Sequence, residues 1–181
     1  MKKALMIVSV LLIAVISTAC INNIAVQELN NKAAEFMQKG DYESAMNRLQ
    51  ASLDLDSTLY ETHYNLGVAA INAEKYEKAI EALENGLKLK PDYAEFYYSL
   101  GVAQAELADE IIDCDDSDDN EHKPTQEELD KAKSLRIASN ENLSKYLEKV
   151  PSSKDKETIE ELILENNKFI ENDDNLVKVE K

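Results

Sequence analysis

Few side chains in this sequence could carry out covalent chemistry. The two histidines, His63 and His122, belong to no Ser/His/Asp pattern and to no metal-binding motif. Cys114 lies between Asp113 and Asp115, whose negative charges disfavour the thiolate that a nucleophile needs. The sequence also lacks a glycine-rich phosphate-binding loop, an HExxH helix and a CxxC pair. We therefore expect a protein that is not an enzyme and that holds no cofactor or metal ion.

An acidic run from Asp109 to Glu121 is the other place where side chains could act together. It contains eight acidic residues and no basic one, with carboxylates spaced as if to converge on a hard cation. The run lacks the glycine turn and the terminal glutamate spacing of an EF-hand loop. Because blocks of like charge repel one another, we interpret it as a solvated loop. A cation-responsive structural role for this Asp-rich segment is the alternative.

The overall charge narrows the class of partner. The chain has 181 residues, with 20 Lys and Arg against 36 Asp and Glu, which gives a formal net charge of −16. Nucleic acid is a poor partner, since phosphate binding needs a basic surface. The hydrophobic fraction of 44% is enough for a core, and only 4 Gly and 3 Pro favour a mostly helical chain. We expect a protein partner that is basic or neutral.

The N-terminus has the parts of an export signal. Lys2 and Lys3 precede an apolar run over 4–16, which is followed by small residues. This run is too short to cross a bilayer comfortably, because a spanning helix needs about 20 apolar residues. A signal peptide over 1–19 is therefore predicted, with an uncleaved anchor as the alternative.

The end of this segment, Thr18-Ala19-Cys20, resembles the lipobox of bacterial lipoproteins, although Ser17 stands where an aliphatic residue is usual. The resemblance implies that Cys20 carries the lipid, with palmitate among its acyl chains, and that residues 20–25 form a lipidated N-terminus with a short linker. The protein would then be anchored to a membrane of the bacterial cell envelope after export. The alternative is an ordinary secreted protein that is cleaved near Ala19.

A 34-residue repeat organises the rest of the chain. Leu66-Gly67 recurs as Leu100-Gly101, and other residues recur at the same spacing: Tyr42, Ala45 and Leu53 as Tyr76, Ala79 and Leu87. A period of this length marks helical hairpins that stack because none buries its apolar face alone.

The residues from Tyr60 to Tyr93 resemble one tetratricopeptide repeat. The positions that carry the resemblance are Leu66, Gly67, Tyr76, Ala79, Leu83, Gly86 and Pro91. It implies an all-α fold, a tetratricopeptide-type solenoid of helical hairpins with a C-terminal capping helix. His63 takes a position at which the family has an aromatic residue, so we expect it to pack between helices. Mid-helix Gly86 is expected to allow a close contact.

The same pattern divides the chain. A degenerate first repeat is expected over 26–59, a regular second over 60–93 and a third over 94–151. The third repeat carries an insertion between its helices, because its proline appears at position 151 instead of position 125. Its helices should extend over roughly 94–113 and 125–149, the second starting with a capping box of Thr125 and Glu128. A capping helix over 152–171 and a flexible tail over 172–181 follow.

The resemblance implies that the first helix of each repeat lines a concave groove. Carried over to this sequence, the groove residues are Asn30, Met37, Glu61, Tyr64, Val68, Ile71, Asn72, Glu95, Tyr98, Val102 and Glu106. Tyrosine suits protein recognition because it buries a large rigid area and keeps a polar tip. Repeats that clamp a partner's terminal carboxylate need Lys or Arg where this chain has Glu95. Tyrosines at these positions also serve the scaffold in the family, which is the alternative for Tyr64 and Tyr98.

The sequence therefore predicts a membrane-anchored module for protein–protein interaction, acting as an adaptor or envelope assembly factor. A partner peptide or helix would bind in the concave groove, at an effective concentration raised by the membrane tether. In one alternative the extended helices of the third repeat carry the interface. In the other the protein is the cation-responsive structural lipoprotein described above.

Overall fold

The computed structural model of the protein describes residues 23–112 and 124–179, with side chains as far as residue 172. Cys20, Cys114, His122 and the signal segment lie outside the described residues, as does most of the acidic run. In the described part all regular structure is helical. A first helix covers 23–38 and is followed by α2 (Tyr42–Leu55), α3 (Tyr60–Asn72), α4 (Tyr76–Leu89), α5 (Ala94–Ile112), α6 (Gln126–Lys149) and α7 (Lys156–Val179).

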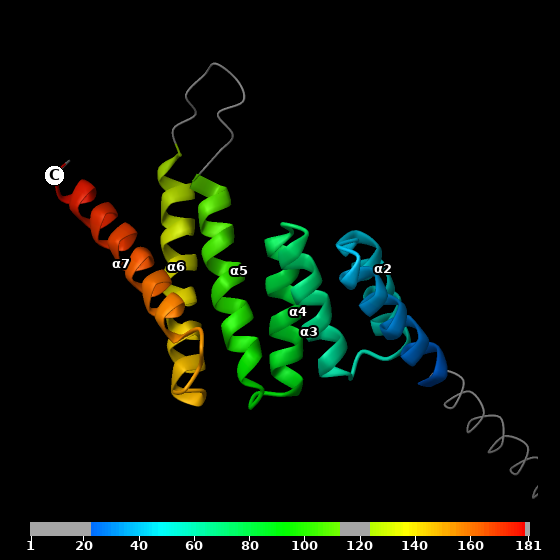
Figure 1. The fold of residues 1–181 in the computed structure, drawn as a ribbon. Helices are drawn as coiled ribbons and strands as arrows, with labels where there is room; N and C mark the ends of the chain where they lie inside the picture. The colour runs from blue at the N-terminus through cyan, green and yellow to red at the C-terminus, as the bar shows by residue number, and fades with distance from the viewer. Residues whose placement is uncertain (1–22, 113–123, 180–181) are drawn as a thin grey trace, which may run out of the picture.

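The helices stand side by side in chain order and form a stack of antiparallel hairpins (Figure 1). Helix 23–38 pairs with α2, α3 with α4, and α5 with α6. Contacts between successive elements hold the stack together, and the α5–α6 pair has the most extensive of them. The all-α solenoid of helical hairpins predicted from the sequence is thereby confirmed.

The repeat register can be read from two close contacts between paired helices. A Cβ atom built on Gly67 would lie closer than 3.0 Å to the Leu83 side chain, and one on Gly101 equally close to that of Leu143. Each glycine lets a buried leucine of the partner helix approach its backbone, which makes Leu143 the equivalent of Leu83. The glycine and its leucine are further apart along the chain in the α5–α6 hairpin than in the α3–α4 hairpin. The difference equals the displacement of the proline from position 125 to position 151, so the predicted insertion lies between α5 and α6.

The turns inside the first two hairpins also repeat. Gly40 has a φ of 75°, and Glu74, at the same place in the next repeat, has a φ of 56°. After the first turn, Asp41 caps α2 by accepting a hydrogen bond of 3.0 Å from the Ser44 backbone N–H. Both hairpins therefore close through one residue in the left-handed region, which glycine occupies without strain and glutamate does not.

An aromatic cluster joins the second hairpin to the third. Phe96 at the start of α5 is fully buried, and its ring lies 5.4 to 6.5 Å from those of Tyr60, Tyr64 and Tyr93. A Cβ atom on Gly86 would lie closer than 3.0 Å to the Phe96 ring. The close contact expected at Gly86 is thus present, and it lets the Phe96 ring of α5 pack against α4.

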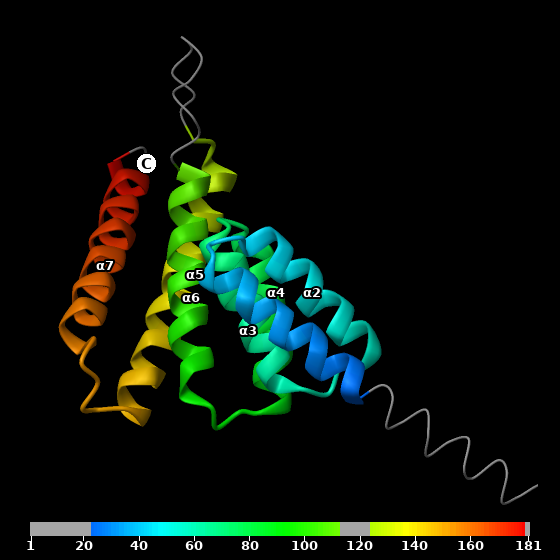
Figure 2. The same ribbon diagram turned by 45° about the vertical axis from the view of Figure 1, so that its right-hand side comes forward.

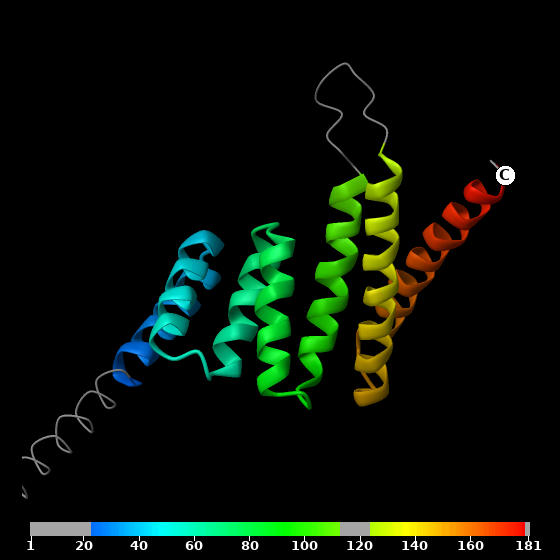
Figure 3. The same ribbon diagram turned by 180° about the vertical axis from the view of Figure 1, so that it is seen from behind.

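The third hairpin is longer than the others and projects beyond them (Figures 1 and 3). α6 starts with Thr125 as its N-cap in a full capping box with Glu128, as the sequence predicts. α7 packs on α6, where it buries Ile159 and Asn166, and its C-terminal end diverges from α6 (Figures 1 and 3). It continues to Val179 and so is longer than predicted, since no Pro or Gly follows Pro151 to stop it.

Candidate binding groove

The first helices of the three hairpins, helix 23–38, α3 and α5, line one face of the stack, called the inner face below (Figure 2). Between α3 and α5 this face has a pocket of about 210 Å³. It is lined by Tyr64, Val68, Ile71, Asn72, Tyr98, Ser99 and Val102. Six of these seven residues belong to the predicted groove, and the seventh, Ser99, is new. The fold therefore brings together six of the eleven predicted groove residues in one pocket.

Tyr64 is fixed in place by the scaffold. Its ring stands edge-on to those of Tyr93 and Phe96, at centroid distances of 5.4 and 5.6 Å. Burial is the main reason that the pKa of its phenol is raised, and a hydrogen bond with Ser99 acts in the opposite direction. Tyr64 thus presents one side of a fixed ring to the pocket, and it serves the scaffold at the same time.

Tyr98 is half-buried on the opposite wall of the pocket. Its ring lies 5.3 Å from that of Tyr146, which α6 contributes. Burial raises the pKa of Tyr98, and the negative charge of Asp155 in the α6–α7 turn adds to this effect. Sequence reasoning missed Tyr146 at this place, although its position, equivalent to Gly86, could have flagged it as a bulky residue where the family has a small one.

A wider and more polar hollow of about 500 Å³ lies between helix 23–38 and α3. Asn30 and Glu61 line it, both from the predicted set. The amide of Asn30 is already engaged. Its Nδ2 donates to Ser52 Oγ at 2.8 Å, and its Oδ1 accepts from Thr62 Oγ1 at 3.1 Å. Asn30 therefore ties helix 23–38 to α2 and α3 in addition to lining the hollow.

The remaining predicted residues lie outside both hollows. Met37 is half-buried and packs against the apolar core of the first two hairpins. Glu106 is exposed and accepts a long hydrogen bond of 3.5 Å from the Tyr76 hydroxyl. Burial and the charge of Glu106 raise the pKa of Tyr76. Glu95 also lies outside the two hollows, but its charge helps to raise the pKa of Tyr64.

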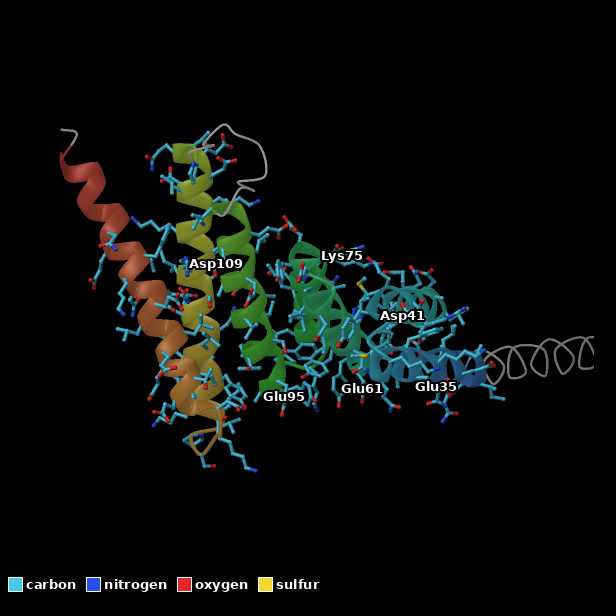
Figure 4. The ribbon with its side chains drawn as sticks, turned by 45° about the horizontal axis from the view of Figure 1, so that its top comes forward. Glu35, Asp41, Glu61, Lys75, Glu95 and Asp109 are labelled. Atoms are coloured by element: carbon cyan, nitrogen blue, oxygen red, sulfur yellow. The ribbon has the colours of Figure 1, made fainter. Side chains whose placement is uncertain are left out.

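Acidic side chains follow one edge of the inner face. Glu35, Glu61 and Glu95 come from the three first helices and lie along the same edge of the stack, whereas Lys75 lies on the opposite side (Figure 4). An apolar pocket beside a row of carboxylates is suited to a segment with an apolar anchor and positive charge nearby. Within residues 23–112 and 124–179 we find no cluster of three or more His, Cys, Asp or Glu that could hold a metal ion.

The family model of the TPR repeat matches residues 33–70 and 73–107. Over these residues the chain is similar to tetratricopeptide repeats. Solved TPR domains share the fold over most of their length. The second TPR domain of human RPAP3 has a TM-score of 0.58 and 16% identity, over 81% of this chain and 98% of that one.

Two further TPR domains show the same likeness. The first TPR of Spaghetti (RPAP3) has a TM-score of 0.56 and 17% identity, covering 79% of this chain and 90% of that one. The Sgt2 TPR domain from Aspergillus fumigatus has a TM-score of 0.54 and 17% identity, covering 83% and 82%. No curated protein matches this chain significantly. At these identities the likeness establishes the TPR fold alone. Among the described helices, none combines the length and apolarity needed to cross a membrane.

Proposed function

We propose that this protein is an interaction module that binds a segment of a partner protein on its inner face. The observation that carries the proposal is the pocket between α3 and α5, in which Tyr64, Val68, Ile71 and Val102 offer an apolar recess. Solved TPR domains of the same fold support it, because the Spaghetti domain is bound to the HSP90 peptide SRMEEVD and the human RPAP3 domain to the HSP70 peptide SGPTIEEVD. The function is therefore binding and not catalysis.

The partner segment proposed here differs in charge from those two peptides, which both end in Glu-Glu-Val-Asp. Glu35, Glu61 and Glu95 along the edge of the inner face would repel such a sequence (Figure 4). A segment with an aliphatic or aromatic anchor and neighbouring Lys or Arg has the complementary charge. The apolar anchor would supply most of the affinity, and the charges would select the partner.

A random peptide library displayed on phage tests the groove without assuming a partner. Selected peptides should combine an apolar anchor with Lys or Arg. Val68→Asp with Val102→Asp should weaken their binding at least about tenfold, because docking would bury unpaired carboxylates. The matched control is Leu89→Asp, which replaces an exposed apolar residue that lines none of the hollows described above. Peptides that are acidic, or that bind the double variant normally, would refute the groove assignment.

We further propose that the module is an adaptor or assembly factor held at a membrane of the bacterial envelope through a lipid on Cys20. The support is the sequence around that residue, Thr18-Ala19-Cys20. A metabolically incorporated alkyne analogue of palmitate should label the wild-type protein. The Cys20→Ala variant should stay unlabelled and should be found in the soluble fraction. Cys114→Ala is the control and should keep both the label and the membrane association. Labelling of Cys20→Ala would remove this part of the proposal.

A further inference from the structure

The other face of the stack has a pocket that the groove does not involve. It lies between α2 and α4, the second helices of two successive hairpins, and has a volume of about 280 Å³. Leu66 and Ala82 are buried residues in its lining, and Leu53 adds a half-buried apolar wall. His63 also lines it. We call it the outer pocket.

His63 brings an unused hydrogen-bond acceptor to this place. The residue is 8% exposed, and its Nε2 lies 3.0 Å from the carbonyl oxygen of Ser57. A carbonyl oxygen can only accept, so Nε2 carries the proton, and Nδ1 of the neutral ring is left as an acceptor. Nδ1 is buried, and no hydrogen-bond partner is described for it. A buried acceptor without a donor is costly, which favours a ligand that supplies one.

The next junction of the same solenoid shows what fills the equivalent space. There Tyr97 replaces His63, and its hydroxyl donates to the Pro91 carbonyl at 3.1 Å, as the His63 ring does to Ser57. Nζ of Lys145 lies 5.9 Å from the centroid of the Tyr97 ring, and Nζ of Lys149 lies 5.4 Å from it. Two ammonium groups from the chain itself therefore cover this ring.

The first junction lacks those lysines. In the register given by Leu83 and Leu143, the equivalent of Lys145 is Asn85, and Asn85 lines the outer pocket. At the first junction a shorter, uncharged side chain therefore stands where the second has a lysine over the aromatic ring.

The charged groups around the outer pocket also favour a cation. Asp54 and Glu81 line it with two carboxylates, whereas Lys78 is the one positive charge among the described residues of its lining. Gln50 donates to Asp54 at 3.3 Å, a long contact that leaves most of the acceptor capacity of this carboxylate open. An apolar wall beside carboxylates matches a side chain with an aliphatic stem and a cationic head.

We propose that the outer pocket binds a lysine or arginine side chain of a partner protein. The methylene stem packs against Leu53, Leu66 and Ala82. The cationic head is held by Asp54 and Glu81 and donates to Nδ1 of His63. This site lies on the face opposite the groove and does not depend on it, so the module can hold two segments at once.

Nuclear magnetic resonance with a one-lysine peptide, acetyl-Ala-Lys-Ala-amide, tests the site in the full chain with His122→Gln, which leaves one imidazole. The peptide should shift the amide signals of Asp54 and Ala82 and the ¹⁵N signal of His63 Nδ1. The norleucine analogue, which lacks the ammonium group, should leave the Nδ1 signal unchanged. Asp54→Asn with Glu81→Gln should weaken binding roughly threefold to tenfold, as for two exposed ion pairs.

Asn85→Lys is the sharpest variant, because it supplies from within the chain the lysine that Lys145 supplies at the next junction. It should abolish peptide binding, whereas Asn85→Met, of similar length and without charge, should retain it. Val68→Asp in the groove should leave the outer pocket unaffected. Equal shifts by the norleucine peptide, or undiminished binding to Asn85→Lys, would overturn the proposal. Self-association that Asn85→Lys removes would place a second copy of this chain in the pocket and would also overturn it.

Discussion

At the scale of single residues, the repeats show which positions the sequence determines and which depend on neighbours. Val68, Ile71 and Val102 could be predicted to share one surface, because the 34-residue register fixes the side of the helix on which each lies. The role of Asn30 in linking three helices could not be predicted, because it depends on Ser52 and Thr62 from two other helices. The outer pocket could not be predicted for a similar reason. It depends on α4 having the short Asn85 at the position where α6 has Lys145.

The left-handed residue in each of the first two turns gives a prediction at this scale. Glu74→Gly should stabilise the protein by about 1 kcal/mol, because a side chain in this conformation costs about that much and glycine avoids it. Gly40→Ala should destabilise it by a similar amount, and for the backbone reason alone, since nothing lies within 4 Å of the added Cβ atom. Urea denaturation followed by circular dichroism measures both.

Glu74→Ala is the control for the lost charge, because Glu74 also contributes to the acidic surroundings of Tyr76. Alanine removes the carboxylate and keeps the strained backbone. If Glu74→Ala stabilises the protein as much as Glu74→Gly does, charge repulsion and not backbone strain explains the gain.

At the scale of the elements, a network of polar contacts holds α7 on α6. Asn166 is fully buried, and its Oδ1 accepts a hydrogen bond of 2.8 Å from Arg136 of α6. Its Nδ2 donates to Ser139 at 3.1 Å. Arg136, itself 5% exposed, also pairs with Asp109 of α5 and stacks on the Phe169 ring at 4.7 Å. This network ties α7 to α6 and, through Asp109, to α5.

One of the two central residues of this network could be predicted from the sequence. Asn166 interrupts the apolar stripe of Ile159, Leu162, Ile163 and Ile170, so a buried polar residue on α7 could have been inferred. Its partner could not, since no local pattern distinguishes Arg136 from the exposed charges of α6. The start of α6 was predictable for a local reason, the capping box of Thr125 and Glu128.

Asn166→Ala should therefore loosen α7 selectively. It leaves Arg136 without its Asn166 acceptor in a buried place, which costs about 1–3 kcal/mol. Hydrogen–deuterium exchange should show reduced protection in α7 and in the facing part of α6, with α3 and α4 unchanged. The matched control is Asn167→Ala, which removes an exposed neighbour with one hydrogen bond to Asn140. Equal loss of protection in both variants would mean that the buried network does not hold the helix.

At the scale of the whole molecule, the excess of negative charge dominates. The net charge is −16, and the described ion pairs of Lys32 with Glu28, Lys75 with Glu43 and Lys156 with Glu160 are exposed. Exposed pairs contribute at most about 1 kcal/mol each, and salt screens them. Mutual repulsion of the carboxylates opposes the compact state and is screened as well. Because acidic groups outnumber basic ones 36 to 20, the screened repulsion outweighs the screened attraction.

Added salt should therefore raise the melting temperature, and the kind of salt separates two interpretations of the acidic composition. Sodium chloride and calcium chloride at matched ionic strength should stabilise the protein equally if screening is the cause, since screening depends mainly on ionic strength. Choline chloride should match sodium chloride, because carboxylates bind the choline cation poorly.

A specific site would instead give calcium an extra stabilisation that saturates with concentration, because a ligand that binds only the folded state stabilises it by mass action. Differential scanning calorimetry of the full chain distinguishes the two outcomes. An extra effect of calcium would favour the cation-responsive role of the Asp-rich segment over a purely solvating one.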